Sequence, residues 1–301
     1  MAGGGRGTLE VLLPALGGET ASAHVLDALG REIVAGFALV DDGCAAIVEA
    51  AEIARGIDEP GDVGPPAASS YGSGRLITAG IGRGAEELGQ VGSLAASSYG
   101  TGQLIAAAID AGAQVVFVAV GGSAGRDDGA GAAQAIVDGG GLRGANLVVL
   151  CDERTRWQPK GDTARSAPWL QQHDPQVARS PHGAALGGAG GGLAGGLRAR
   201  LGAELVSGAA FVLEELGFDA RMRAARAVVV ADASLDAGML AGRVSGEIAV
   251  RARQAGIPCH AVGTRAALEP FDVRILDLQA VLAVGSIAEL EAAGEELARH
   301  L

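Results

Sequence analysis

The chain has 301 residues, of which 49% are hydrophobic and 3% aromatic, and its formal net charge is −12 at pH 7. A chain of this length and apolar content can bury one or two ordinary cores, which excludes a disordered protein. The negative charge and scarcity of aromatic residues argue against nucleic acid or an anionic membrane as a partner. An anionic small-molecule substrate would need a local basic patch.

The cysteines and histidines give no sign of a disulfide framework or a zinc site. Cys44, Cys151 and Cys259 are far apart and lack C-x-x-C spacing, and the five histidines are scattered. We therefore expect a reduced, cytoplasmic protein. No uninterrupted apolar stretch reaches the roughly 20 residues that a membrane span needs.

The N-terminal segment imitates a signal peptide but has helical spacing. Glu10 interrupts its apolar run, and the leucines of LEVLLPAL recur at a helical period. We expect a helix that Thr8 caps and Gly17 ends. The segments IVAGFALV and CAAIVEA, joined by Asp-Asp-Gly, then predict a β-hairpin.

An internal repeat follows, AASSYGSGRLI from Ala67 and AASSYGTGQLI from Ala95. Two copies are too few for a solenoid, which indicates a local duplication. The second copy continues through a helix-like AAAIDAG into an apolar strand, so we expect Ser97, Ser98, Thr101 and Gly102 to belong to the α/β framework. We expect Ser69 to Gly74 of the first copy to repeat the motif at the surface.

The strand AQVVFVA is followed at once by VGGSAGRDDGAG from Val120. Glycines allow a sharp turn, and Ser123, Asp127 and Asp128 supply polar groups at the carboxyl end of a buried strand, where open α/β sheets bind ligands. A turn in which Asp127 or Asp128 simply caps the next helix is an equally good interpretation.

A further strand, LVVLC, ends at Asp152, and a glycine-rich segment lies near residue 190. That segment contains G-x-G-x-x-G spacing at Gly190, Gly192 and Gly195, but no strand precedes it. Close helix packing is therefore a better explanation of these glycines than a dinucleotide site.

The C-terminal third alternates strands and helices. AVVVAD, PCHAVG and VRILDL are expected strands, and EIAVRARQAG is an expected helix, which together predict a parallel sheet of βαβ units. Asp236 falls in the loop after the first of these strands. Ser286 and Glu289 are spaced as a capping box for the last helix.

Three motifs of the chain together resemble those of one known family. GGSAGRDDGAG from Gly121 is similar to a Gly-Gly-Ser-Ala-Thr-Asn-Asp-Gly-Gly-Ala-Gly loop, departing from it at Gly125, Arg126 and Asp128. SYGTGQLI from Ser98 matches a Ser-Tyr-Gly-Thr-Gly-x-Leu-Ile element in full, and GGGLAGGLRARLGAEL is similar to a glycine-rich helix. The family is that of the bacterial glycerate kinases, and the resemblance covers most of the chain with gaps.

Other family motifs are matched only in part. GGGRGT from Gly3 is similar to Asp-Gly-Gly-Glu-Gly-Thr without its two carboxylates, because Gly3 and Arg6 replace them. ADASLDAGMLAGR keeps Asp236 of the corresponding family loop but has Arg243 where the family has Lys. The only lysine of the chain, Lys160, lies in QPKGDT, which is similar to the family's Pro-Gln-Lys-Gly-Ala-Thr.

The resemblance implies a glycerate-kinase-like α/β fold of two α/β parts with a parallel sheet, one part inserted in the other. We expect one such unit over residues 1–301, lacking the family's opening strand, with sub-domain boundaries near 56–66 and 153–181.

The resemblance also implies transfer of the γ-phosphoryl group of ATP to a glycerate hydroxyl, with Mg²⁺ as cofactor. Asp127 and Asp236 would bind Mg²⁺ or accept the hydroxyl proton, and Lys160 would supply a compact positive charge. Backbone N–H groups of residues 121–124 would hold phosphate at the start of the next helix. The expected nucleotide- and substrate-binding residues are Gly121, Gly122, Ser123, Ser98, Thr101, Arg243 and Arg126.

Two alternatives remain open from the sequence. The lost carboxylates are compatible with a catalytically silent homologue that binds a small anion or a partner. The second alternative is an unrelated NAD-binding α/β protein, although no strand precedes the G-x-G-x-x-G spacing of this chain as such a site requires.

Overall fold

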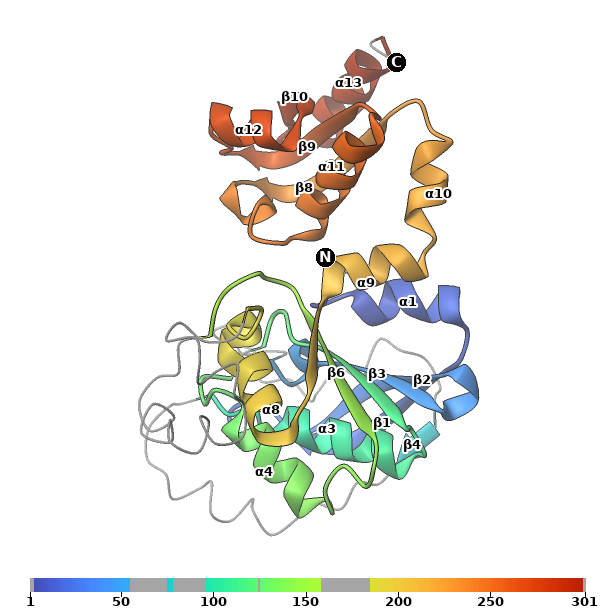
Figure 1. The fold of residues 1–301 in the computed structure, drawn as a ribbon, viewed down its shortest axis with the longest axis vertical. Coiled ribbons are helices and arrows are strands. Elements are labelled where there is room, and N and C mark those ends of the chain that lie inside the picture. Colours follow the sequence, from blue (N-terminus) through green and yellow to red (C-terminus); the bar gives the residue numbers. More distant parts are fainter. Residues whose placement is uncertain (1–2, 55–74, 78–95, 124, 158–184, 300–301) are drawn as a thin grey trace. The chain divides into compact units, whose positions relative to one another are not determined.

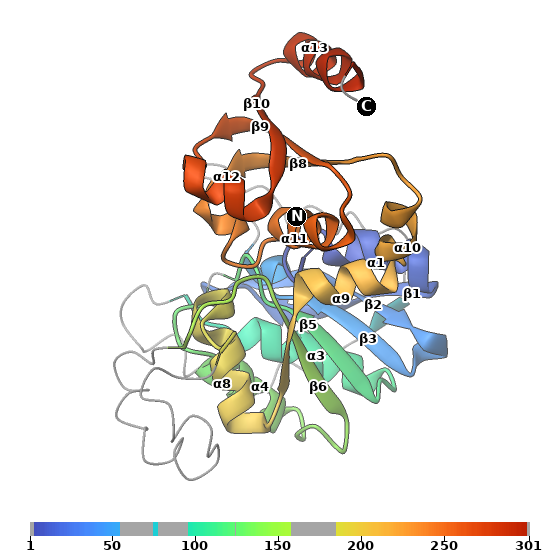
Figure 2. The same ribbon diagram turned by 45° about the horizontal axis from the view of Figure 1, so that its top comes forward.

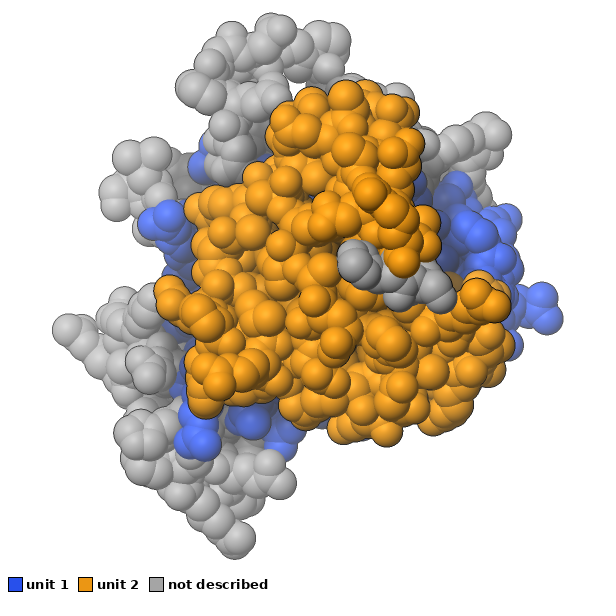
Figure 3. All heavy atoms as spheres, turned by 90° about the horizontal axis from the view of Figure 1, so that it is seen from above, with its two compact units in different colours: residues 1–212 blue, residues 213–301 orange. Residues whose placement is uncertain are grey.

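The computed structural model describes residues 3–54, 75–77, 96–123, 125–157 and 185–299. The chain divides into two compact units, residues 1–212 (unit 1) and 213–301 (unit 2), which are coloured separately in Figure 3. Each unit has its own sheet and its own buried core, and each is described by itself.

Unit 1 contains a mixed seven-stranded sheet of order β4-β1-β2-β3-β5-β6-β7. β1, β2 and β3 pair antiparallel, whereas β3, β5, β6 and β7 pair parallel and therefore end at the same edge. The strands are β1 (Glu19–Leu26), β2 (Glu32–Val40), β3 (Ala45–Glu49), β4 (Arg75–Ile77), β5 (Val115–Ala119), β6 (Asn146–Cys151) and β7 (Glu204–Ser207).

Helices cover both faces of this sheet. One face carries α3 (Tyr99–Asp110), α4 (Ala130–Asp138) and α8 (Leu193–Leu201), and the other carries α1 (Thr8–Leu16) and the start of α9 (Gly208–Glu215) (Figures 1 and 2). Phe211 of α9 packs against Phe117 of β5, with ring centroids 4.9 Å apart. Short 3-10 turns η1 (Asp41–Gly43), η2 (Ala50–Ala54) and η3 (Ala189–Gly192) complete the unit.

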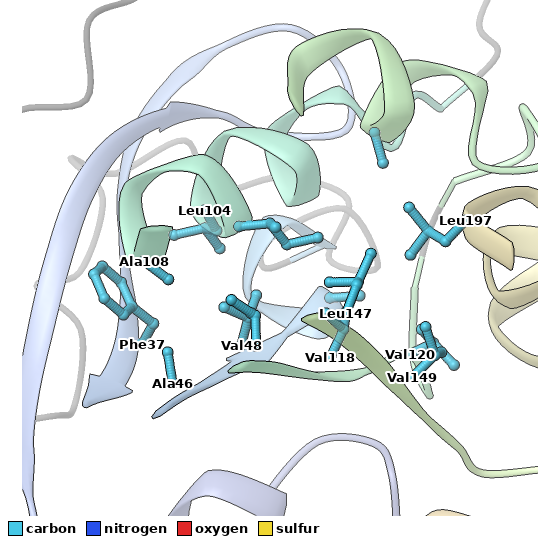
Figure 4. Packing of buried hydrophobic residues seen from close by; sticks show 14 of the residues in the cluster. Phe37, Ala46, Val48, Leu104, Ala108, Val118, Val120, Leu147, Val149 and Leu197 are labelled. Carbon is cyan, nitrogen blue, oxygen red and sulfur yellow. The ribbon is translucent and has the colours of Figure 1, made fainter. Parts of the chain in front are cut away.

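The core of unit 1 is built from small and branched aliphatic side chains (Figure 4). Leu104 of α3 lies above Val118 of β5, and Leu197 of α8 lies above Val149 of β6; all four are fully buried (Figure 4). Burying a side chain such as Leu104 contributes about 1.5–3 kcal/mol. Because so few residues are aromatic, alanine and glycine let the layers approach closely.

Unit 2 is a parallel three-stranded sheet of order β10-β9-β8. Neighbouring residues of β9 show its two faces, since Ala261 packs with α10, α11 and α12 whereas Val262 packs with α13. The elements are β8 (Val228–Leu235), η4 (Ala237–Met239), β9 (Cys259–Ala266), β10 (Leu278–Ala283), α10 (Phe218–Arg223), α11 (Val244–Ala255), α12 (Pro270–Leu276) and α13 (Ile287–Ala298).

Most of the expected elements are confirmed. The β2–β3 hairpin, β5, β6, α3 and the parallel sheet of the C-terminal third form where the patterns predicted them. Ser286 caps α13 by accepting the Glu289 amide, as in a capping box. The Glu289 carboxylate accepts the amide of Gly285 instead of the Ser286 amide that a capping box uses.

Two expectations about local structure were wrong, and one strand was missed. VRILDL is not a strand: Pro270 starts α12 through Leu276, and the strand β10 begins only at Leu278. Thr8 does not cap α1 from outside, because it is the first helical residue, and its hydroxyl donates to Gly5 O and accepts the Gly4 amide. The strand β1, which includes Ser22, was not predicted at all.

The two α/β parts follow one another along the chain rather than one lying inside the other. The division falls within α9, and among the described residues every strand of the larger sheet precedes every strand of the smaller one. The boundary expected near 56–66 lies outside the described residues, as does most of that near 153–181. Among the described helices, none is long and apolar enough to cross a membrane.

Candidate active site

The turn after β5 is packed against two other segments at the carboxyl edge of the unit 1 sheet. The Gly121 amide donates to Gly4 O at 2.7 Å. A Cβ on Gly121 would lie 2.5 Å from Asp152 Oδ2 and 2.8 Å from Gly5 Cα, so only glycine fits here. The next residue, Gly122, has φ of +78°, which also favours glycine.

Residues 3–5 run along this edge of the sheet. A Cβ on Gly4 would lie 2.6 Å from Leu150 O of β6, and one on Gly208, just after β7, would lie 2.5 Å from Gly3 O. Residues 3–5 belong to the segment that matches the family's Asp-Gly-Gly-Glu-Gly-Thr loop in part. They therefore lie at the carboxyl ends of β5, β6 and β7. That edge is where parallel sheets bind ligands.

Asp127 is held by five hydrogen bonds. Its Oδ1 accepts the Ser98 hydroxyl at 2.8 Å and the Gly129 amide at 3.1 Å. Its Oδ2 accepts the Ser98 amide at 2.8 Å, the Ser97 hydroxyl at 3.1 Å and the Gly131 amide at 3.2 Å. A carboxylate offers about four lone-pair sites, so the local donors saturate Asp127.

The start of α4 is consequently occupied by the protein itself. Asp127 accepts the Gly131 amide of the first turn, and Ser98 Oγ accepts the Ala132 amide at 2.9 Å. The amides of Gly121 and Ser123 donate to Gly4 O and Val120 O. Of the amides expected to hold phosphate, those of Gly121 and Ser123 therefore already have an internal acceptor, as does that of Gly131 at the positive end of the helix dipole. The phosphate site itself remains a prediction.

The other expected residues of unit 1 divide into buried and accessible ones. Ser98 and Thr101 are fully buried at the start of α3, and Thr101 Oγ1 has no hydrogen-bond partner among the described residues. Arg126 is exposed, and Ser123 is half-buried with its Oγ accepting the Gly125 amide at 3.3 Å. Lys160 lies outside the described residues.

A tryptophan contact holds the glycine-rich helix α8 in a way that the sequence did not predict. Trp157 is 1% exposed, and its Nε1 donates to Asp128 Oδ1 at 3.4 Å. A Cβ on Gly195 would lie 2.4 Å from the Trp157 ring, and Arg200 Nη1 donates to Asp128 O at 2.9 Å. Close packing is therefore confirmed as the reason for Gly195. The sequence carries no signal for this contact, because Trp157 is 38 residues away along the chain.

Asp236 lies just after β8 in unit 2 and is bound by two arginines. Its Oδ1 accepts the Gly238 amide at 2.8 Å and lies 3.2 Å from Arg243 Nη1. Its Oδ2 accepts the Ser234 hydroxyl at 2.6 Å and lies 3.5 Å from Arg265 Nη2. The Ser234 hydroxyl, followed by the Gly238 amide and the two arginines, lowers the pKa of Asp236 from its ordinary value.

The loop after Asp236 is tight. A Cβ on Gly238 would lie 2.6 Å from Arg243 Cζ, so the Arg243 guanidinium rests against bare backbone. A Cβ on Gly246 would lie 1.8 Å from Met239 O, which brings the start of α11 against η4. Asp232, earlier in β8, accepts the hydroxyl of buried Ser245 at 2.8 Å. The arginine that replaces the family's lysine is thus fixed in place.

Asp127 and Asp236 belong to different units, so their expected joint role in one active site remains a prediction. In the part of the chain that the structure describes, no group of three or more His, Cys, Asp or Glu side chains could hold a metal ion. Their assignment as magnesium ligands likewise remains a prediction.

Comparison with known proteins decides the family. The model of the glycerate kinase family matches residues 1–93, 88–139 and 164–301. The chain belongs to the glycerate kinase family. The loops around Ser123 and Asp236 both lie within matched segments, and the two copies of the repeat fall in separate ones, whereas Lys160 lies in the unmatched stretch between 139 and 164.

A solved structure has the same fold. The crystal structure of "putative glycerate kinase 2" from Salmonella typhimurium LT2 aligns with a TM-score of 0.59 and 23% identity, covering 99% of this chain and 88% of that one. The α/β glycerate-kinase-like fold is thereby confirmed. A search of curated proteins found no significant match.

Proposed function

We propose that this chain is a glycerate kinase that transfers the γ-phosphoryl group of ATP to a hydroxyl of glycerate. The observation that carries the proposal is the family match, which includes both loops at strand ends, residues 121–131 after β5 and residues 236–246 after β8. Phosphoryl transfer needs little covalent chemistry from a protein, since positioning and charge stabilisation supply most of the rate.

In unit 1, Ser123 and Arg126 are the side chains that we assign to ligand binding. Both are accessible, and both lie in the loop that starts at the carboxyl end of β5. Asp127 acts as a positioning residue in this proposal, because its five hydrogen bonds tie that loop to the starts of α3 and α4. The buried Ser98 supports the same arrangement from α3.

In unit 2, Arg243 binds an anionic group, and Asp236 orients the Arg243 guanidinium. Arg243 is 40% exposed, and its Nη1 also donates to Ser234 O at 3.2 Å, so its guanidinium is held in one position. A fixed guanidinium loses less entropy on binding a carboxylate or phosphate than a mobile one. The lowered pKa keeps Asp236 ionised at neutral pH, which suits orientation of an arginine better than proton abstraction.

Magnesium does not fit these two carboxylates as they are arranged. Donors saturate Asp127, and Asp236 has two guanidinium groups within 3.5 Å, which would repel a divalent cation. We therefore derive no step through the ion. ATP supplies the transferred phosphoryl group, and Lys160, outside the described residues, is proposed to offset its charge.

A catalytically silent homologue is the second candidate, and one observation favours it. The start of α4, which the family resemblance assigned to phosphate, is filled by Asp127, and the loop at residues 3–8 lacks both family carboxylates. Such a protein would bind ATP or glycerate without turnover, as a family fold allows.

The test measures ADP release by a coupled optical assay in the presence of D-glycerate and ATP. The wild-type chain is compared with Arg243→Ala and with Arg299→Ala, an exposed arginine at the end of α13 that serves as control. We expect glycerate-dependent ADP release that falls about tenfold or more in Arg243→Ala and not in Arg299→Ala. Calorimetric binding of ATP without any turnover would favour the silent homologue.

A further inference from the structure

A second arginine, from a different strand, lies beside the Asp236 site. Arg265 is near the end of β9, and its Nε and Nη2 donate to the Ser234 hydroxyl at 3.1 and 3.0 Å. The same hydroxyl donates to Asp236 Oδ2, which Arg265 Nη2 approaches to 3.5 Å. Ser234 therefore joins Arg265 to the carboxylate that also holds Arg243.

The charges of this cluster are not balanced. Two guanidinium groups flank one carboxylate, which leaves one positive charge among Arg243, Arg265 and Asp236. Asp232, the next acid along β8, accepts Ser245 Oγ and the Ser234 amide instead. Holding two like charges around one carboxylate costs free energy that a bound anion would offset. In a chain with a formal charge of −12, this is a local basic site of the kind an anionic substrate needs.

The two guanidinium groups contact different atoms of Ser234 and Asp236 and remain accessible. Arg243 rests against Gly238 and donates to Ser234 O, whereas Arg265 is held by Ser234 Oγ. Their side chains are 40% and 71% exposed. A guanidinium carries five N–H donors, and these contacts use Nη1 of Arg243 and Nε and Nη2 of Arg265, so donors remain on each for an external oxyanion.

The position of the pair in the sheet agrees with a ligand site. β8 and β9 are parallel neighbours, so Asp236, after β8, and Arg265, at the end of β9, meet at the carboxyl edge. This is the edge at which open parallel sheets bind ligands. An ordinary surface ion pair contributes little and needs no second cation, whereas this arrangement brings in a second guanidinium from the neighbouring strand.

We propose that Arg265 and Arg243 together bind an oxyanion of the substrates, either the glycerate carboxylate or a phosphate group of ATP. Asp236 and Ser234 are the positioning residues that hold the two guanidinium groups. The identity of the oxyanion as a substrate group rests on the proposed function; the presence of an oxyanion site does not. Both ligand groups share the bidentate geometry that arginine recognises.

The test measures binding to the full chain by calorimetry, with D-glycerate, ATP and inorganic phosphate as separate probes. Arg265→Ala is compared with Arg265→Lys, which keeps the charge without the planar fork, and with Arg299→Ala as control. We expect the affinity for at least one probe to fall about tenfold or more in Arg265→Ala, less in Arg265→Lys, and not at all in Arg299→Ala. Loss for ATP and phosphate assigns a phosphate site, and loss for glycerate alone assigns the carboxylate.

Two results would overturn the inference: Arg265→Ala binding all three probes as tightly as the wild type, or a wild type that binds none of them. The outcome is separate from that of the kinase assay. Binding that depends on Arg265 without ADP release would reject the kinase and leave the oxyanion site in place. ADP release that Arg265→Ala does not alter would support the kinase and reject the role of Arg265.

Discussion

The Ser98 hydroxyl donates a 2.8 Å hydrogen bond to Asp127 and accepts the Ala132 amide, so one side chain joins the start of α3 to the start of α4. Asp127 completes the link by accepting the Ser98 amide and the Gly131 amide. The carboxylate thus stabilises the loop after β5 as a helix cap would, which is the simpler of the two interpretations that the sequence allowed.

We predict that Asp127→Asn lowers the free energy of unfolding by about 2–5 kcal/mol, because the amide nitrogen would face at least two part-buried donors that lose their acceptor. Urea unfolding of the full chain measures this change in the free energy of unfolding. Asp42→Asn is the matched control, since Asp42 is exposed with φ of 51° and asparagine tolerates that conformation. Equal stability of the two variants would contradict the structural role of Asp127.

Tyr99 offers a pH-dependent test of the same region. Burial, and then the hydrogen bond that its hydroxyl donates to Asp138, raise the pKa of Tyr99 to about 12. The unfolded phenol ionises near pH 10, so stability should fall as pH rises from about 10 toward 12. Asp138→Asn should lower this pKa.

The tyrosine titration can be followed by absorbance. The chain has two tyrosines, so a Tyr71→Phe background leaves Tyr99 as the only one that titrates. Asp110→Asn, at an exposed residue on the same helix, serves as control. A Tyr99 pKa near 10 in the folded chain would refute the prediction.

Glycine at position 195 is predicted to be required by the Trp157 ring. Gly195→Ala should destabilise the protein by about 1–3 kcal/mol, because its Cβ would lie 2.4 Å from ring atoms that are themselves buried. Gly294→Ala in α13 is the control, since a Cβ there has open space, and alanine should stabilise that helix by about 0.5–1 kcal/mol. Thermal unfolding should therefore move in opposite directions in the two variants.

The two copies of the internal repeat, from Ala67 and from Ala95, differ in a way that favours the second copy in α3. The copies differ at two of eleven positions, and at one of them the second copy has Gln103, whose Oε1 accepts the Leu26 amide at 2.7 Å in a buried position. The first copy has Arg75 there, and an arginine would bury a charge that cannot accept this hydrogen bond.

We accordingly expect Gln103→Arg to cost about 2–4 kcal/mol of unfolding free energy, whereas Thr101→Ser, the other difference, should cost about 1 kcal/mol. Urea unfolding compares the two variants. A Gln103→Arg chain as stable as Thr101→Ser would show that the copies are interchangeable in α3.

Elements marked by a strong local pattern could be predicted from the sequence. The apolar run of β5 and the Asp-Asp-Gly turn between β2 and β3 carry their own signals, and α13 starts at the expected Ser286. β1 was missed because its small alanine and serine residues have little β propensity. VRIL was misassigned as a strand because its β-branched residues outweighed the helix start at Pro270.

Side-chain roles in the site were harder to predict than strands. That Asp127 would be saturated depends on Ser97 and Ser98, about thirty residues earlier, contacting it from the start of α3. Arg265 approaches Asp236 only because β8 and β9 are neighbours in one sheet, which no short motif encodes. Such pairings follow from tertiary structure, so the sequence could name the loops but not the contacts within them.

The measurement that tests the central claim most directly is ³¹P nuclear magnetic resonance of the full chain incubated with ATP and D-glycerate. We predict a new phosphomonoester signal that grows as the γ-phosphate signal of ATP declines. With Arg243→Ala this signal should grow at least about tenfold more slowly. An unchanged ATP spectrum from folded protein that binds ATP would contradict the claim that the chain transfers phosphate to glycerate.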